Sequence, residues 1–188
     1  METLTFVIHG DPGTGKSWLA DTAPGPRLVL DAEGGAKFTP SPKVEWTNVN
    51  DAPPELGEGV ETVVVKIRDL KTLQSVFTWL NRGQHPFRSV IIDSLSEVQK
   101  RAVDEIAGVE QMRTQDWGAL LRKGESLVRA FRDLTMHPAN PVACVVFVCL
   151  TAERGDQKVQ QRPYLQGQLG TSLPGFVDVV GYLAVELT

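Results

Sequence analysis

Residues 10–17 constrain the fold more than any other part of the chain. They read Gly-Asp-Pro-Gly-Thr-Gly-Lys-Ser and fit the pattern G-x-x-x-x-G-K-[ST] at every fixed position. A β-branched and aromatic run, 4–8, precedes them, and residues 15–21 have helical composition. A strand, a glycine loop and a helix in this order predict a phosphate-binding loop. The flanking elements make this prediction much stronger than the eight letters alone.

Each part of this loop suits the binding of a nucleotide. Its glycines let successive backbone amides turn toward a phosphate, and the start of the helix adds partial positive charge. Lys16 can reach the β and γ phosphates, and the Ser17 hydroxyl can ligate magnesium. We therefore predict ATP and magnesium as cofactors. The predicted nucleotide-binding residues are Gly10, Asp11, Pro12, Gly13, Thr14, Gly15, Lys16, Ser17 and Trp18. The sequence assigns no role of its own to the last of these.

Strands and helices alternate along the rest of the chain. Apolar runs predict strands at 28–30, 62–67, 90–92, 142–150 and 177–187, with 44–49 as a candidate edge strand. Helical spacing predicts helices at 69–80, at 95–106 and from 114 to just before Pro138. Residues 151–163 are polar and are expected to form an exposed loop. The alternation predicts a single α/β domain over 1–188, a three-layer α/β/α sandwich with a mostly parallel sheet.

Composition limits the classes of function. The formal charge of −4 means that any contact with nucleic acid must be a local basic patch. Cys144 and Cys149 are five residues apart on a predicted strand, so they point to opposite faces and cannot pair. A chain with only two cysteines is consistent with a reducing compartment. The longest apolar run, 142–150, is too short to span a membrane. A cytoplasmic protein without a membrane partner is expected.

Two acidic residues follow predicted strands and complete a candidate catalytic site. Asp93 ends the strand at 90–92, where a metal-binding aspartate is needed. Its alternative role is to cap the helix that follows. Glu33 lies just past the strand at 28–30, on the same edge of the sheet, where it could orient or deprotonate water. Its alternative role is that of an exposed turn residue.

Several segments resemble ATPases of the RecA superfamily, and more closely the phage-encoded RecA-like nucleotide-binding proteins that include single-strand annealing recombinases. The resembling segments are 13–17, 30–35, 91–95, 115–118 and 175–180. The first three are shared by many ATPases, whereas the last two are narrower. RecA proteins have Asp-Ala-Glu after the second core strand, so the resemblance implies that Glu33 is the catalytic base beside Lys16, and that Asp93 and Ser17 hold the metal.

The resemblance also implies a function in DNA recombination. A magnesium-dependent ATPase acting on single-stranded DNA in annealing or strand exchange is expected, as a homo-oligomer in the host cell cytoplasm. A single-strand-binding protein is a candidate partner. Thr151 stands at the strand tip where RecA has a γ-phosphate-sensing glutamine. The sequence does not determine the oligomer size, or whether a ring or a filament forms.

Two loops correspond by order to the strand-binding loops of RecA. The first, 108–116, holds Arg113. The second, 151–170, holds Arg154, Lys158 and Arg162 together with Tyr164, which combines cations with an aromatic ring. An arginine there could instead complete a neighbour's ATP site in trans, or the loop could simply be solvated. The sequence leaves these three readings open.

Two other functions remain open at this point. A small P-loop kinase of nucleotides or metabolites would use an arginine-rich lid, for which only Arg154 and Arg162 are available. A nucleotide-gated loading switch would need no catalytic base, so Glu33 discriminates it from an ATPase. Trp117 falls on the apolar stripe of the long helix and is expected in the core. Because the helix starts beside the first loop, a role as a base-stacking platform stays open.

Overall fold

The computed structural model describes residues 2–108, 112–154 and 160–186. In them, seven strands form a parallel sheet in the order β3-β4-β2-β5-β6-β1-β8, and β7 pairs antiparallel with β6. The strands are β1 (Leu4–Gly10), β2 (Arg27–Asp31), β3 (Lys43–Glu45), β4 (Thr62–Lys66), β5 (Ser89–Asp93), β6 (Cys144–Arg154), β7 (Gln160–Pro163) and β8 (Val179–Leu183). The helices are α1 (Lys16–Ala20), α2 (Leu70–Leu80), α3 (Leu95–Ala107), α4 (Thr114–Asp133) and α5 (Leu169–Ser172), with 3-10 turns η1 (Gly35–Phe38), η2 (Leu134–Met136) and η3 (Leu173–Phe176).

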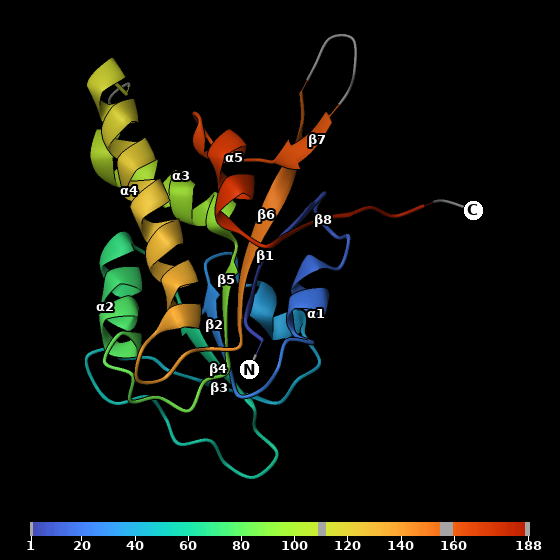
Figure 1. Ribbon diagram of the computed structural model, residues 1–188, viewed down its shortest axis with the longest axis vertical. Coiled ribbons are helices and arrows are strands. Elements are labelled where there is room, and N and C mark those ends of the chain that lie inside the picture. Colours follow the sequence, from blue (N-terminus) through green and yellow to red (C-terminus); the bar gives the residue numbers. More distant parts are fainter. Residues whose placement is uncertain (1, 109–111, 155–159, 187–188) are drawn as a thin grey trace.

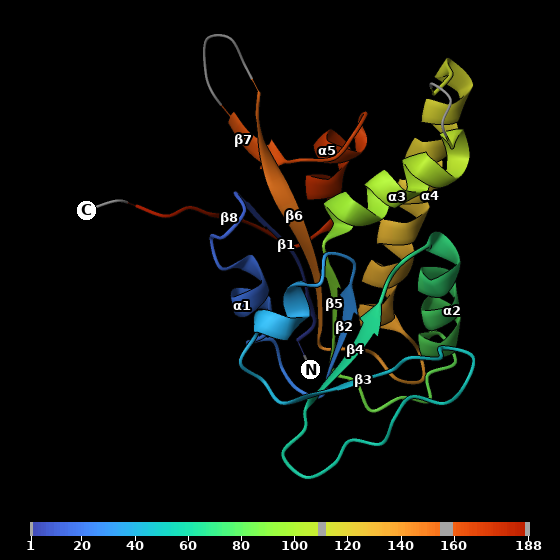
Figure 2. The ribbon, with the colours of Figure 1, turned by 180° about the vertical axis from the view of Figure 1, so that it is seen from behind.

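Helices cover both faces of the sheet. Figures 1 and 2 show α1 and η1 on one face, and α2, α3 and α4 on the other. Burying both faces favours continuous apolar strands, and this is the pattern of β5 and β6. The predicted three-layer arrangement with a mostly parallel sheet is therefore confirmed.

The side chains of β6 alternate between two apolar clusters. Phe147 and Cys149 pack into the larger cluster under α2, α3 and α4, whereas Val146 and Cys144 belong to the smaller one on the face of α1. The two cysteines are buried, free and on opposite faces, as the spacing predicted. The alternation follows from the two-residue repeat of an extended strand.

Helix caps place α2 and α3 close to their predicted starts. The Asp69 side chain accepts a hydrogen bond from the backbone N–H of Thr72 at 2.6 Å. Ser94 does the same for the N–H of Glu97 at 3.2 Å. Ser94 alone separates β5 from α3, so the helix begins directly after the last residue of the strand, Asp93.

The prediction of an exposed loop at 151–163 was wrong. Strand β6 continues to Arg154 and pairs with β7 as a hairpin, in which Thr151 lies opposite Pro163 and Ala152 opposite Arg162. Backbone groups make this pairing, so the polar side chains gave no sign of it. The hairpin extends past the rest of the sheet (Figure 1). Its side chains therefore need not form an apolar face. The outer strands β3 and β8 are shorter than the ranges 44–49 and 177–187 predicted.

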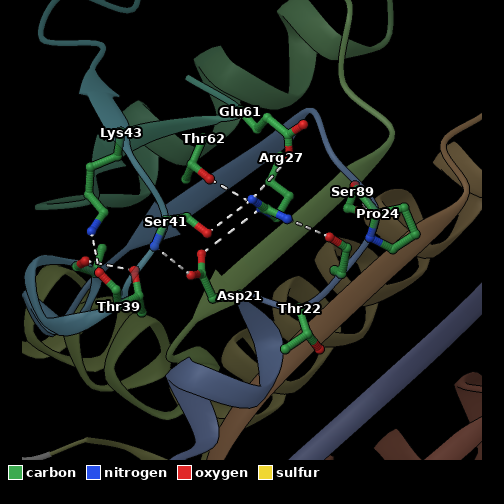
Figure 3. A network of polar contacts seen from close by, with 12 residues as sticks. Asp21, Thr22, Pro24, Arg27, Thr39, Ser41, Lys43, Glu61, Thr62 and Ser89 are labelled. Carbon is green, nitrogen blue, oxygen red and sulfur yellow. Dashed lines mark hydrogen bonds and ion pairs between the residues drawn. The ribbon is translucent and has the colours of Figure 1, made fainter. Parts of the chain in front are cut away.

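A buried ion network ties α1 to the opposite, amino-terminal edge of the sheet (Figure 3). Arg27 begins β2, and its guanidinium donates to the Thr62 and Ser41 hydroxyls at 3.1 and 3.0 Å. The carboxylates of Asp21 and Glu61 lie 4.0 and 3.6 Å from it. Asp21 also accepts a hydrogen bond from the backbone N–H of Ser41. Arg27 and Asp21 are both buried, so the Arg27 guanidinium compensates the charge of the Asp21 carboxylate, and Glu61 adds a second carboxylate beside Arg27.

Arg27→Met is expected to lower the free energy of unfolding by about 3–5 kcal/mol, because it leaves the Asp21 carboxylate buried without its cation. Urea unfolding of the variant measures this loss. Asp21→Asn added to Arg27→Met should recover part of it. Lys66→Met is the matched control, since it breaks an exposed ion pair with Glu45 and should cost less than about 1 kcal/mol. Equal losses for Arg27→Met and Lys66→Met would contradict the role given to the buried network.

Candidate nucleotide site

The loop at 10–17 joins β1 to α1 at the carboxyl edge of the sheet. Gly13 and Gly15 have φ of +82° and +88°, a conformation that other residues rarely adopt. Gly10 is needed for a different reason: a Cβ there would lie 2.3 Å from the carbonyl oxygen of Leu183 on β8. The glycines of the motif are therefore explained by the backbone path and by the close approach of β8.

Lys16 lies across the loop that it belongs to. Its side chain is buried, and Nζ donates to the carbonyl oxygens of Gly10 at 3.0 Å and Asp11 at 2.6 Å. Burial lowers the pKa of Lys16, and the nearby carboxylates of Glu33 and Asp93 oppose that change. The ammonium group is thus held among the backbone groups that would surround a phosphate.

Asp93 meets Ser17 at the end of β5. The two side chains are hydrogen-bonded, and a Cβ added at Gly35 would lie 3.2 Å from Ser17 Oγ and 3.5 Å from Asp93 Oδ2. Burial raises the pKa of Asp93 to about 6, the Ser17 hydrogen bond opposes this, and the charges of Asp31 and Glu33 add to it. A hydroxyl and a carboxylate are the hard oxygen ligands that magnesium prefers, so this pair fits the predicted metal.

Glu33 stands on a short turn that Asp31 organises. The Asp31 carboxylate accepts hydrogen bonds from the backbone N–H groups of Gly34, Gly35 and Ala36 at 2.7, 3.1 and 3.3 Å. The Ser94 hydroxyl donates a hydrogen bond to the Glu33 carboxylate, which joins this turn to the end of β5. Because β2 and β5 are neighbours with Asp31 opposite Asp93, both acidic segments reach the same edge.

Sequence reasoning gave Asp31 no role beyond its place in the Asp-Ala-Glu motif. A signal was present, because an aspartate three and four residues before paired glycines is typical of a turn held by its side chain. His9 was also missed. It directly precedes Gly10, and only the fold brings its side chain to Thr151.

Thr151 connects the nucleotide loop to the hairpin. Its Oγ1 lies 2.9 Å from His9 Nδ1, and it donates to the carbonyl oxygen of Arg162 at 3.2 Å. His9 is buried and packs against the Tyr182 ring at a centroid distance of 5.2 Å. Burial and the positive charge of Lys16 lower the pKa of His9. A contact path therefore runs from His9, the residue before Gly10 of the loop, through Thr151 to Arg162 on β7.

The predicted cations occupy different environments. Arg154 ends β6, Arg162 lies on β7 with Nη2 donating to Gln160 Oε1 at 2.6 Å, and Lys158 falls outside the described residues. Arg113 precedes α4 and forms two hydrogen bonds with Asp116, at 2.9 and 3.2 Å. This local ion pair offsets the charge that Arg113 would offer to a phosphate.

Two tryptophans are exposed. Trp18, on α1 just after the loop, is 57% exposed. Trp117 is 39% exposed, which corrects the expectation of a core position. The apolar stripe of α4 is buried from Leu120 onward, but the first turn of the helix extends past the helices that cover the rest of the stripe.

Residues 2–188 match the model of a protein family described as an AAA domain. The chain belongs to the AAA domain family. An AAA domain of the P-loop type implies nucleotide binding and hydrolysis, which agrees with the prediction made from residues 10–17. No curated protein matches the chain.

The AAA domain has the fold of a solved ATPase structure. A prototypical ATPase from the type III secretion system of pathogenic bacteria is similar with a TM-score of 0.55 and 16% sequence identity. The similarity covers 97% of this chain and 52% of that one, so the AAA domain spans about half the length of the secretion ATPase chain. At this identity the likeness concerns the fold alone. Among the described residues, no helix is both long and apolar enough to cross a bilayer.

The pKa of Asp93 predicts how stability depends on pH without nucleotide and magnesium. The folded value, about 6, lies above the ordinary 3.8, so the folded chain holds this proton more tightly than the unfolded chain does. The contribution of Asp93 to stability therefore falls as the pH rises from about 4 to above 6. Asp93→Asn removes the buried charge, and it should raise the free energy of unfolding at pH 8 by on the order of 3 kcal/mol. The difference from the parent should shrink toward pH 4.

Asp178→Asn is a control in which the free energy of unfolding at pH 8 should change in the opposite direction. Hydrogen bonds from Thr5 lower the pKa of Asp178, so its contribution is present above the ordinary pKa and is lost in acid. This variant should therefore be less stable than the parent at pH 8. Urea unfolding across pH 4–8 measures both variants. An Asp93→Asn protein that is less stable than the parent at pH 8 would contradict the assignment of a buried, unfavourable charge.

Proposed function

We propose that the chain is a magnesium-dependent ATPase in which Glu33 is the catalytic base. The observation that carries the proposal is the convergence of Lys16, Ser17, Asp93 and Glu33 at one edge of the sheet, supported by the coupling of their charges and by the Ser94–Glu33 hydrogen bond. Together these residues supply what hydrolysis of ATP needs: a cation that binds the phosphates, oxygen ligands for the metal, and a group that activates the attacking water.

Each residue has a distinct task in this mechanism. The backbone N–H groups of the loop and the Lys16 ammonium bind the β and γ phosphates. Ser17 and Asp93 would hold magnesium, which neutralises charge that develops on the phosphate oxygens when it is bound. Glu33 orients the water and accepts its proton. Asp31 and Ser94 position Glu33 through the turn and the side-chain hydrogen bond already described.

We further propose that this ATPase acts on single-stranded DNA, in annealing or strand exchange, as a homo-oligomer, with a single-strand-binding protein as a candidate partner. The resemblance of residues 115–118 and 175–180 to phage-encoded recombination proteins supports this reading. The contact path His9–Thr151–Arg162 supports it physically, because it would let the state of the nucleotide loop alter a cationic hairpin. Arg154, Lys158 and Arg162 would then contact the phosphates of the strand.

One measurement tests the proposed function most directly: the rate of ATP turnover with and without single-stranded DNA. Stimulation by DNA is the expected result. Turnover that needs a small phosphate acceptor instead would identify a kinase and overturn the proposal. Lys16→Ala should abolish ATP binding and turnover in every case, since it removes the cation held inside the loop.

Glu33→Gln is expected to keep ATP affinity and to lower kcat about 100-fold or more, because a positioned general base contributes at least that much. Steady-state kinetics and a separate nucleotide titration measure the two effects. Glu45→Gln is the control, an exposed glutamate on β3 whose loss should leave kcat unchanged. If Glu33→Gln hydrolysed ATP at the parent's rate, Glu33 would be only a turn residue.

Arg154→Ala, Lys158→Ala and Arg162→Ala should each weaken binding to single-stranded DNA of any sequence. Each should also flatten the dependence of log affinity on log salt by roughly 0.7, the value for one phosphate contact. Basal ATP turnover should be retained. Lys43→Ala, at the start of β3 and the opposite edge of the sheet, is the control. A loss of turnover on the order of 1000-fold with unchanged DNA affinity would instead identify an arginine that acts in trans.

A further inference from the structure

A cavity lies beside the hairpin, and none of its lining residues is among those assigned to the nucleotide. Its volume is about 340 Å³, which is within the range of small-ligand sites. It is formed by the first turn of α4, the β6–β7 hairpin and the segment that leads to α5. Its lining residues are Trp117, Ala152, Arg162, Pro163, Tyr164, Leu165, Gln166, Gly167 and Gly170.

Two aromatic side chains that line this cavity are exposed. Trp117 is 39% and Tyr164 is 40% exposed, although large rings usually stabilise a protein by being buried. They come from different segments, Trp117 from α4 and Tyr164 from the residue just after β7, and line the same cavity. Two accessible aromatic rings in the lining of one cavity suit a planar ring as occupant.

Hydrogen bonds to α3 and β6 hold the segment that carries Tyr164. The Tyr164 backbone N–H donates to the Leu150 carbonyl at 2.7 Å, and its own carbonyl accepts from the Ser96 hydroxyl at 2.8 Å. The Gln99 side chain forms hydrogen bonds with both the N–H and the carbonyl oxygen of Gln166. A wall fixed in this way loses little further freedom when a ligand binds.

Polar groups accompany the rings. Arg162 lines the cavity from β7 and supplies a cation. Gln166 lines it too, and its side-chain Oε1 is buried without a hydrogen-bond partner among the described residues. An unpaired buried acceptor is costly, so a donor from a ligand would stabilise it. Rings, one cation and an amide together match the groups of a nucleotide within a strand better than they match a purely apolar molecule.

We propose that this cavity takes one unstacked base of the single-stranded DNA. The base stacks against Trp117 and Tyr164, Gln166 offers its amide to the base edge, and Arg162 contacts the adjoining phosphate. This inference rests on the proposed function in DNA binding and adds a specific base subsite to it. Since Arg162 also accepts the Thr151 hydrogen bond through its carbonyl, the subsite lies at the end of the path from the nucleotide loop.

The test compares an oligothymidylate with an abasic strand of the same length and phosphate count. For the parent, removal of the bases should weaken binding about 5- to 150-fold, the effect of one stacking contact. Trp117→Leu keeps an apolar side chain on α4 but removes the ring, so it should bind the oligothymidylate that much more weakly and the abasic strand as the parent does. Trp117→Phe should retain most of the discrimination, and Tyr164→Leu should lose part of it.

The salt dependence and a matched control separate stacking from charge. Trp117→Leu should keep the parent's slope of log affinity against log salt, because it removes no phosphate contact. Met136→Ala is the control, an exposed apolar side chain just beyond the other end of α4, and it should bind both strands as the parent does. Thermal unfolding confirms that each variant is folded.

Three results would overturn the inference, and they differ from one another. If the parent binds neither strand, the proposed DNA function fails and the base subsite fails with it. If the parent binds DNA but Trp117→Leu and Tyr164→Leu discriminate the two strands as it does, only the base subsite is wrong. If Trp117→Leu raises KM for ATP without DNA and leaves DNA affinity unchanged, the cavity holds the base of ATP instead.

Discussion

Four parallel strands, β2, β5, β6 and β1, lie side by side, and their hydrogen-bonded register determines where every candidate catalytic group can be. Asp31 is opposite Asp93 on β5, and Gly10 is opposite Leu150 on β6. Because parallel strands all end at the same edge, residues that are far apart in sequence meet there. A shift of one residue in any of these pairings would turn the side chains of that strand to the other face and break up the site.

Charge balance is the second constraint on this edge. The Lys16 ammonium is buried near the carboxylates of Glu33 and Asp93, and burial disfavours both signs of charge. A magnesium ion and a phosphate chain would add opposite charges to the same space, which compensates for the desolvation of the protein groups. The site is thus electrostatically incomplete on its own, as expected of a surface that binds a charged ligand.

The proposed DNA function depends on a physical link between two regions. His9 and Thr151 provide it, since one side-chain contact joins the strand before the nucleotide loop to the strand that forms the hairpin. The same hairpin contributes Arg162 to the cavity between Trp117 and Tyr164. Movement of the loop when nucleotide binds could therefore reach both the cations and the aromatic rings through groups that are already in contact.

The sequence by itself determined the nucleotide loop, the alternation of strands and helices and the identity of Asp93 and Glu33 as candidates. These features are local: a glycine that needs positive φ, an apolar run or a cap at a helix start is visible within a few neighbouring residues. The AAA family match agrees with this local reading of residues 10–17.

Only the tertiary structure decided the remaining features. The hairpin at Thr151 depends on backbone pairing across residues of polar character, which composition does not record. The exposure of Trp117 depends on which helices cover α4, although its spacing is that of a core residue. His9 became part of the site because β6 lies beside β1, a choice made by long-range packing. Local patterns determine which element forms, whereas neighbours distant in sequence determine which of its side chains meet.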